Sequence, residues 1–170
     1  LTGGRLARAK GFDVVIGAFT KNGKNLKIFG KGFAGYEQEL ESRIKNHESR
    51  IEFVGEVTDE EKLELMKRAK AFVFASYDED FGITPVEAMS MGTPVIAYRS
   101  GGVQETVIDG KTGLFFNENT PESLNQAIDE FEKKKFTMTE CTNHTKKFSK
   151  ERFIQEIQNC IAEKAFQGGM

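Results

Sequence analysis

The sequence predicts an α/β fold in which a Rossmann-like parallel sheet carries helices on both faces. Short strand-like runs alternate along the chain with segments whose apolar residues recur at helical spacing, and this alternation is typical of parallel sheets whose strands are joined by helices. One run, from Ala71 to Ala75, is apolar at every position. A strand buried on both faces of a parallel sheet has this composition.

Strands are expected at six places. Five runs are rich in β-branched, aromatic or leucine residues, and a sixth, at the start of the chain, has the pattern of the end of a strand. In chain order the six ranges are residues 1–6, 26–29, 51–54, 71–75, 94–98 and 113–116. Their carboxyl ends would meet at one edge of the sheet, where folds of this kind bind ligands.

Four apolar stripes predict helices between and after these strands. They lie within residues 12–19, 63–69, 124–131 and 153–161. Capping residues mark the start of three of these helices. Thr58 and Glu61 form a capping-box pattern, Thr120 precedes a proline at the first helical position, and Ser149 precedes the last stripe.

The length and composition are those of one globular domain. The chain has 170 residues, of which 38% are hydrophobic and 29% charged, which is enough for one sizeable core. We expect residues 1–135 to form the core and residues 136–170 to form a helical extension. Because the chain starts with leucine inside a strand-like run, we interpret it as a piece of a longer protein.

Charge and cysteine usage exclude several classes of protein. The net charge of −2 gives no overall attraction to nucleic acid, and no run approaches the 18 apolar residues of a membrane span. Cys141 and Cys160 have neither a CxxC spacing nor a secretory signal, which indicates reduced thiols in a cytoplasmic protein. His47 and His144 belong to no motif, and we interpret both as surface or structural residues.

The strongest candidate for a binding site is the stretch from Glu79 to Glu87, EDFGITPVE, which follows the strand at 71–75. Thr84 is followed by a proline, and Glu87 lies three positions on. This capping-box pattern predicts a helix that begins at Thr84. The amides of residues 82–84 would then lie at a helix N-terminus, where anions bind, and the glycine there would let a phosphate approach the backbone closely.

Two cations are expected at the same edge of the sheet. Arg5 leaves the first strand, and Lys10 precedes the first helix. An arginine fork and a lysine point charge together suit a diphosphate. Either residue alone would be interpreted as ordinary surface charge.

Three segments together resemble one protein family. They are GRLARAKG at residues 4–11, the E-x7-E pattern from Glu79 to Glu87, and EAMSMGTPVIAYRSGGVQETVIDGKTGLFF at residues 87–116. In this order they resemble the C-terminal, donor-binding domain of retaining glycosyltransferases of family four, which have the two-domain GT-B fold. The resemblance runs from Gly4 to about Phe131 and, more loosely, to the final helix.

The resemblance implies that the chain is a single nucleotide-sugar-binding domain, the C-terminal half of a GT-B fold, and that the N-terminal acceptor domain is absent. The full protein would be a hexosyltransferase acting on a glycan or lipid-linked acceptor. The domain alone would bind nucleotide and transfer little or nothing. Such an enzyme is expected in the cytoplasm, with peripheral contact to the inner membrane face.

The resemblance also implies roles for individual residues. Arg5 and Lys10 would bind the donor diphosphate and stabilise the leaving nucleotide, and Glu79 would hold hydroxyls of the donor sugar; these three are the expected catalytic groups. Glu87 would accept hydrogen bonds from the ribose, and the base would lie against the loop at residues 55–57. The full set of expected donor-binding residues is Gly4, Gly30, Gly32, Val57, Phe81, Gly82, Ile83, Thr84 and Glu87.

The detailed wording of the motifs is most similar to mannosyltransferases of bacterial and archaeal O-antigen and polysaccharide assembly, which use GDP-mannose. GDP-mannose is therefore the expected donor. The family retains the anomeric configuration without a divalent metal, so neither a cofactor nor a metal site is expected.

Three other interpretations remain open at this point. Gly30, Gly32 and Gly35 form a literal GxGxxG after a strand, the pattern of an NAD-binding oxidoreductase, although it follows the second strand and lacks an acidic residue about 20 positions on. Asp78 and Asp80 form a literal DxD, which would hold a metal–diphosphate. A degenerate, non-catalytic binding module is the third, although Arg5, Lys10, Glu79 and Glu87 are all present.

Overall fold

The computed structural model of the chain describes residues 1–32, 35–44 and 50–167. Its strands pair in parallel in two groups of three, in the orders β1-β2-β3 and β4-β5-β6. Their bounds are β1 Thr2–Gly3, β2 Leu26–Phe29, β3 Ile51–Gly55, β4 Phe72–Phe74, β5 Val95–Tyr98 and β6 Gly113–Phe116. All six lie within or next to the ranges that the sequence predicts.

The two groups of strands meet along β1 and β4. The N–H of Val73 donates to the carbonyl oxygen of Leu1 (2.8 Å), and the amino group of Leu1 donates to the carbonyl oxygen of Ala71 (3.1 Å). Leu1 therefore bonds to residues 71 and 73, on either side of the residue that faces it, and this is the hydrogen-bond pattern of parallel strands. The spatial order is therefore β3-β2-β1-β4-β5-β6, a doubly wound arrangement.

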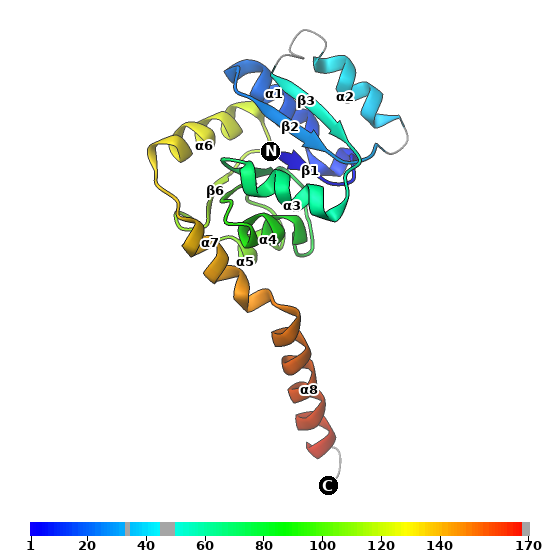
Figure 1. Cartoon of the computed structure of the whole chain (residues 1–170), viewed down its shortest axis with the longest axis vertical. Coiled ribbons are helices and arrows are strands. Elements are labelled where there is room, and N and C mark those ends of the chain that lie inside the picture. Colours follow the sequence, from blue (N-terminus) through cyan, green and yellow to red (C-terminus); the bar gives the residue numbers. More distant parts are fainter. Residues whose placement is uncertain (33–34, 45–49, 168–170) are drawn as a thin grey trace.

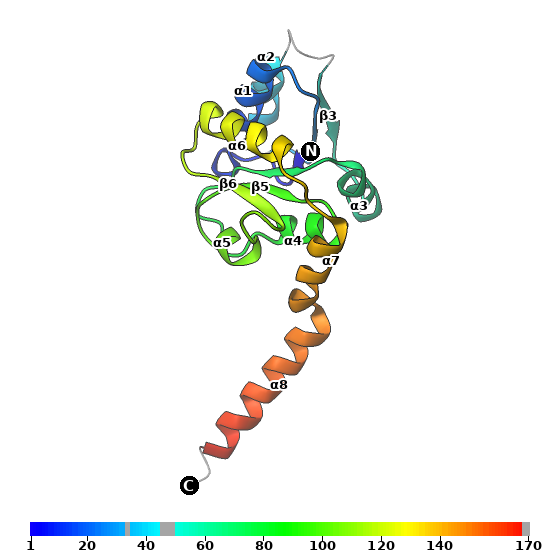
Figure 2. The same ribbon diagram turned by 90° about the vertical axis from the view of Figure 1, so that its left-hand side faces the viewer.

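Helices cover both faces of this sheet, as predicted (Figures 1 and 2). Helices α1, α2 and α6 pack on one face, whereas α3, α4, α5 and α7 lie on the other. The bounds are α1 Phe12–Asn22, α2 Tyr36–Ile44, α3 Asp59–Arg68, α4 Ile83–Ser90, α5 Val103–Thr106, α6 Pro121–Lys133, α7 Met138–Thr145 and α8 Lys150–Gln167, with short 3-10 turns η1 Arg8–Lys10 and η2 Lys146–Phe148.

The strands divide their side chains between two hydrophobic cores. In β4, Val73 belongs to the core beneath α1 and α6, whereas Phe72 and Phe74 belong to the core beneath α4. In β5, Ile96 and Ala97 divide in the same way. Successive residues of a strand point to opposite faces, so a sheet covered on both sides requires the unbroken apolar runs that the sequence shows.

The three predicted helix caps are present. The capping box is complete, because Thr58 Oγ1 accepts from the N–H of Glu61 (3.2 Å) and Glu61 Oε2 accepts from the N–H of Thr58 (2.8 Å). Thr120 Oγ1 accepts from the N–H of Ser123 (3.2 Å) at the start of α6. Ser149 Oγ accepts from the N–H of Arg152 (3.3 Å) at the start of α8.

The last two helices differ in their surroundings. Helix α7 packs against α4, and its Cys141 is fully buried in the second core, so the chain after residue 135 still contributes to the body. Helix α8 extends away from that body (Figures 1 and 2). Among the residues that the structure describes, no helix has the length and apolar composition needed to cross a bilayer.

Candidate functional site

The candidate site lies where the strand order reverses, between β1 and β4. The chain leaves β1 toward α1, on one face of the sheet, and leaves β4 toward α4, on the other. Connections that depart in opposite directions open a crevice beyond the carboxyl ends of the two strands, and doubly wound folds bind their ligands there.

Two adjoining pockets occupy this crevice and share Gly4 and Arg5. The switch-point pocket, of about 370 Å³, is lined by Gly3, Gly4, Arg5, Lys10, Phe74, Glu79, Gly82, Ile83 and Thr84. The β2–β3 pocket, of about 410 Å³, is lined by Gly4, Arg5, Phe29, Gly30, Lys31, Gly32, Glu56, Val57 and Lys62. The structure thus brings together most of the residues that the sequence singles out.

Lys10 and Glu79 form an ion pair in the switch-point pocket. Lys10 ends the 3-10 turn η1, and Gly11 follows it with φ of 66°. A Cβ at Gly11 would clash with the carbonyl oxygen of Ala75, so only glycine lets this turn sit directly against the end of β4. The turn therefore fixes the lysine beside Glu79.

Glu79 is held as a carboxylate. Its Oε2 accepts from Lys10 Nζ and from Ser76 Oγ (2.9 Å). Burial favours the neutral acid, but the hydrogen bonds from Lys10 and Ser76 and the charges of Lys10 and Arg5 together outweigh burial and lower the pKa of Glu79. The carboxylate at the pocket wall is thus charged and an acceptor for hydroxyl groups.

The loop that carries Glu79 rests on two glycines. The N–H of Gly102 donates to the carbonyl oxygen of Glu79 (2.8 Å). A Cβ at Gly101 would clash with that same oxygen, and one at Gly102 would clash with the carbonyl oxygen of Asp80. Asp78 takes the left-handed conformation (φ 48°). The loop geometry therefore depends on close backbone contact with the turn after β5.

Helix α4 does not begin with the predicted capping box. It begins at Ile83, with Gly82 as N-cap at φ of 77°, and no side chain caps it. Because the N-cap is Gly82, two residues before the predicted cap Thr84, Glu87 lies in the second turn of the helix, beyond reach of the N-terminal amides. The backbone N–H groups of Ile83 and Thr84 therefore reach the pocket without a competing side chain, at the positive end of the helix dipole.

Glu87 bonds to a different partner. Its Oε1 accepts from Lys62 Nζ of α3 (2.8 Å), and the same lysine pairs with Asp59 (3.0 Å). Glu87 itself is absent from the residues that line either pocket, but Lys62 lines the β2–β3 pocket. The carboxylate is thus connected to that pocket through the lysine.

Arg5 is available to a ligand. Its neighbour Leu6 is buried, and the N–H of Leu6 donates to the carbonyl oxygen of Lys31 (2.9 Å). This bond fixes the backbone next to Arg5. The Arg5 side chain is exposed, and no ion pair is recorded for it among the described residues. Its guanidinium can therefore serve an anion in either pocket.

The β2–β3 pocket has a glycine-lined wall. A Cβ at Gly30, which has φ of 128°, would overlap the carbonyl oxygen of Gly4. Val57 adds apolar surface to the lining, and Lys31 pairs with Glu56 (3.1 Å). An apolar wall with a few polar groups nearby is typical of a small-molecule site.

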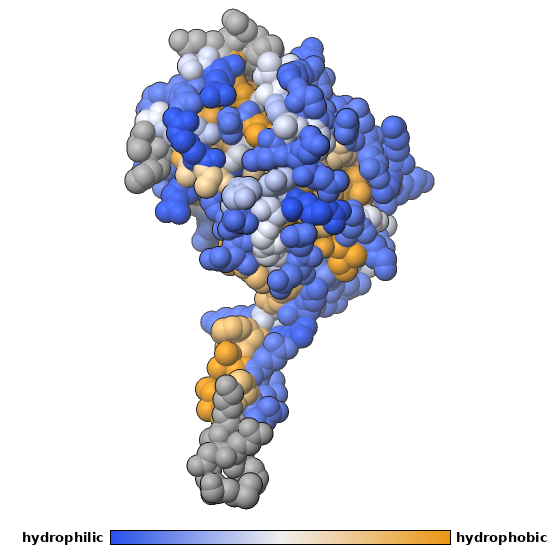
Figure 3. All heavy atoms as spheres, turned by 180° about the vertical axis from the view of Figure 1, so that it is seen from behind, coloured by the Kyte–Doolittle hydropathy of each residue, from blue (hydrophilic) through white to orange (hydrophobic). Residues whose placement is uncertain are grey.

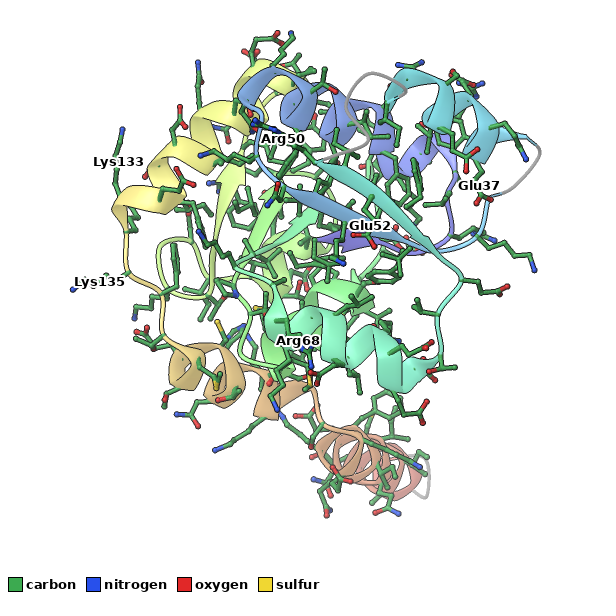
Figure 4. All side chains as sticks on the ribbon, turned by 45° about the horizontal axis from the view of Figure 1, so that its top comes forward. Glu37, Arg50, Glu52, Arg68, Lys133 and Lys135 are labelled. Carbon is green, nitrogen blue, oxygen red and sulfur yellow. The ribbon has the colours of Figure 1, made fainter. Side chains whose placement is uncertain are left out.

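The glycine loop does not support the dinucleotide interpretation. The N–H of Gly32 donates to Glu37 Oε2 (2.9 Å), and Glu37 projects from α2 beside this loop (Figure 4). A pyrophosphate bound by the loop would need that N–H and would meet a carboxylate in its place. Gly35 precedes α2, but the residues between it and Gly32 lie outside the described part of the chain.

Within the described part of the chain, Phe81 and Glu87 are the two expected donor-binding residues that line neither pocket. Phe81 is exposed, its ring packs edge-on against Phe148 (5.5 Å between centroids), and it is absent from the described lining of both pockets. His144 Nε2 lies 2.8 Å from the carbonyl oxygen of Thr106, a structural contact. His47 lies outside the described residues.

The acidic triplet has its own partners. Asp78 Oδ1 accepts from Ser100 Oγ (3.3 Å), and Glu79 pairs with Lys10. Within residues 1–32, 35–44 and 50–167, no group of three or more His, Cys, Asp or Glu residues is arranged to hold a metal ion. Metal-independent binding of the ligand remains a prediction.

The structure adds three residues that the sequence interpretation missed. Ser76 holds Glu79, Glu37 holds Gly32, and Lys62 holds Glu87. Ser76 and Glu37 belong to none of the motifs, so the spacing of residues in the sequence provided no sign of their roles. For Lys62, its position one turn after Asp59 in a capped helix would have placed it on the same face as that acid.

Comparison with known proteins gives a consistent result. Residues 1–151 match the family described as glycosyl transferases group 1. An uncharacterized glycosyltransferase of Methanocaldococcus jannaschii is 33% identical over 164 residues, which cover 94% of this chain and 46% of the relative. The alpha-1,3/1,6-mannosyltransferase ALG2 of Dictyostelium discoideum is 35% identical over 130 residues, 73% of this chain and 31% of the relative.

Solved structures show the same fold. Sucrose-phosphate synthase of Thermosynechococcus elongatus superposes with a TM-score of 0.85 at 25% identity, covering 99% of this chain and 45% of that chain. Anabaena HepE, solved in complex with UDP, superposes with a TM-score of 0.73 at 28% identity, covering 98% and 48%. The chain thus spans less than half the length of these relatives.

Proposed function

Since the chain belongs to the group 1 glycosyl transferases, we propose that it binds the nucleoside-diphosphate sugar of a retaining, metal-independent hexosyl transfer, in the manner of family four. The observation that carries the proposal is the shared wall of the two pockets. Arg5 lines both of them, with Lys10, Glu79 and the start of α4 on one side and the glycine-lined pocket on the other. A nucleoside-diphosphate sugar needs three adjoining regions, one for the sugar, one for the diphosphate and one for the nucleoside.

The proposed binding mode assigns each region. The diphosphate lies at Arg5 and at the amides of Ile83 and Thr84, and the sugar hydroxyls bond to Glu79. The nucleoside extends into the β2–β3 pocket, against Val57. Phe81 and Glu87 remain predicted donor-binding residues, the first through its backbone beside Gly82.

The proposed chemistry follows from charge. Breakage of the anomeric carbon–oxygen bond builds negative charge on the departing diphosphate and positive character on the sugar. Arg5, Lys10 and the positive end of α4 stabilise the first, and Glu79 lies where it can stabilise the second. Fixed charges and dipoles of this kind contribute about 3–4 kcal/mol per group to catalysis.

GDP-mannose is the donor that we favour. The motif wording and the similarity to a mannosyltransferase support mannose, and Glu56 supports guanine. Guanine presents two adjacent N–H donors, which a carboxylate can accept together, whereas uracil presents one N–H between two carbonyl oxygens. A UDP-sugar is the second candidate, because the similar HepE was solved with UDP and with UDP-glucose.

The acceptor is the least constrained part of the proposal. The relatives are about twice as long as this chain, so we assign acceptor binding to a further domain of the whole protein. A glycan or lipid-linked acceptor at the cytoplasmic face of a membrane is the proposed partner.

Titration calorimetry of the chain with GDP, UDP, ADP and NAD, with and without Mn²⁺, tests the proposal. We expect one nucleoside diphosphate to bind without metal, and Arg5→Ala to weaken it about tenfold or more. Lys133→Ala, on the outer edge of α6 (Figure 4), is the matched control and should leave affinity unchanged. Binding of NAD alone, or binding only with Mn²⁺, would contradict the proposal.

A further inference from the structure

We propose that Lys62 is a positioning residue, which holds the Glu87 carboxylate at the edge of the β2–β3 pocket so that it can accept hydrogen bonds from a ribose diol. This inference rests on the proposed function, because it assumes that a nucleotide occupies the pocket. It assigns a role to a lysine of α3 that belongs to none of the sequence motifs.

The geometry joins three side chains from two helices. Lys62 Nζ lies 2.8 Å from Glu87 Oε1 and 3.0 Å from Asp59 Oδ1. Only 19% of the Lys62 side chain and 30% of the Glu87 side chain are exposed, whereas Asp59 is 87% exposed. The lysine is thus bound chiefly to the sheltered carboxylate, with the exposed Asp59 as a second anchor on its own helix.

The lysine is charged in this environment. Burial opposes its charge, but the hydrogen bonds and charges of Glu87 and Asp59 outweigh burial and raise the pKa of Lys62. This cation donates a hydrogen bond to the Glu87 carboxylate. It also offsets a negative charge that would otherwise repel an incoming diphosphate.

The orientation of Glu87 requires an external partner. The predicted local partner, the N-terminal backbone of α4, is out of reach because the helix begins at Ile83. The recorded bond uses Oε1, and among the described residues no donor is recorded for Oε2. Lys62 thus bonds to one oxygen of Glu87 and itself lines the pocket, and we assign the second oxygen to the ligand.

The experiment compares ribose with dideoxyribose. The wild-type chain and the variants Lys62→Met, Lys62→Arg and Glu87→Gln are titrated with the nucleoside diphosphate that binds and with its 2′,3′-dideoxy analogue. In the wild type we expect the dideoxy analogue to bind about tenfold more weakly. Lys62→Met should lose most of this ratio, as Glu87→Gln does, while Lys62→Arg should keep it.

A purely structural role would change other quantities. If Lys62 only joined α3 to α4, Lys62→Met would lower thermal stability and weaken both ligands equally, with the ribose ratio intact, and that outcome would overturn the inference. Lys67→Met, an exposed lysine on the same helix, is the control and should change neither quantity. Failure of the wild type to bind any nucleoside diphosphate would instead overturn the proposed function.

Discussion

Two lysines of the crevice each pair with a carboxylate. Lys10 and Lys62 each pair with a sheltered glutamate at the crevice, while Arg5 has no recorded carboxylate among the described residues. In the proposed function, the site binds a diphosphate through positive charge and sugar hydroxyls through carboxylates. The negative charge of the carboxylates must then not weaken the attraction for the diphosphate. In the proposed binding mode, a lysine balances the charge of each glutamate, so Arg5 and the start of α4 add further positive charge for the phosphates.

The Lys10–Glu79 pair leads to a prediction about pH. Because the folded-state pKa of Glu79 lies below its ordinary value of 4.5, the pair stabilises the fold above that pH, and the contribution is lost as the pH falls through the lowered pKa. We expect Lys10→Met to cost about 1–2 kcal/mol at pH 7 and progressively less toward pH 3, measured by urea unfolding.

The control for this prediction is an exposed ion pair. Lys27 and Glu52 are both more than half exposed, so Lys27→Met should change stability by less than about 0.5 kcal/mol at either pH. An equal loss for Lys10→Met at pH 7 and pH 3 would contradict a role for Glu79 ionisation.

The two cysteines lead to a second prediction. Cys141 is fully buried, and burial raises the pKa of its thiol to about 11, whereas Cys160 is exposed on α8. The thiolate is the reactive form. With a coloured disulfide reagent at pH 8 we expect one fast thiol and a second that reacts at least about 100-fold more slowly until the protein unfolds. Cys160→Ser should remove the fast phase; two fast phases would contradict the burial of Cys141.

At the scale of single residues, sequence reasoning reached the groups that stand in motifs. Arg5, Lys10 and Glu79 follow strands whose carboxyl ends meet, so their convergence was predictable from strand order alone. The Lys62–Glu87 pair was not predictable, because it depends on how α3 packs on α4, and that contact leaves no local pattern. Phe81 was predicted to bind the donor because of its neighbours in the motif. In the structure its ring packs on Phe148, more than 60 residues away in the sequence.

At the scale of elements, capping and periodicity decided what could be predicted. Helices α1 and α6 carry clear apolar stripes and were expected. Helix α2 buries only Tyr36, Leu40 and Ile44 in a strongly polar segment, and α7 buries little besides Cys141, so neither stripe was recognised. The start of α4 was misplaced because Gly82, in the left-handed conformation, forms its N-cap, and a glycine has no side chain to mark that position.

The loop that carries Glu79 leads to a prediction at this scale. At Gly101, a Cβ would combine an unfavourable φ of 66° with a clash against the Glu79 carbonyl oxygen. We expect Gly101→Ala to displace the loop and to lower affinity for the nucleotide-sugar about tenfold or more, with a loss of about 2–3 kcal/mol in stability. Calorimetry and urea unfolding measure the two effects.

Gly110 provides the matched control for that substitution. It has a similar φ of 75°, but a Cβ there would meet nothing within 4 Å. Gly110→Ala should therefore cost about 1–2 kcal/mol from backbone strain alone and leave affinity intact. Equal affinity losses in the two variants would show that loop displacement is not the cause.

At the scale of the whole molecule, α8 stands out because its apolar face is uncovered. Phe153, Ile154, Ile157 and Ile161 recur at helical spacing and are between 43% and 64% exposed. Figure 3 shows apolar side chains gathered along one side of this helix. The sequence predicted the stripe correctly as a helix, but a stripe by itself does not specify what packs on it.

The uncovered face predicts how α8 behaves in this chain alone. Most helical stability in proteins comes from tertiary packing of an apolar face, and the apolar face of α8 has no such packing among the described residues. Helix α6, in contrast, buries Leu124, Ala127 and Ile128. In hydrogen exchange followed by mass spectrometry, we expect the amides of α8 to exchange about 100-fold or more faster than those of α6.

The dependence on protein concentration separates an uncovered helix from a self-associated one. If α8 stands alone, its exchange rate should be the same at low and high concentration, and Ile157→Ser with Ile161→Ser should leave α6 unchanged. Protection of α8 that rises with concentration and disappears in the double variant would mean that a second copy covers the stripe. Protection equal to that of α6 at every concentration would mean that α8 packs on its own body, contrary to the extended arrangement in Figures 1 and 2.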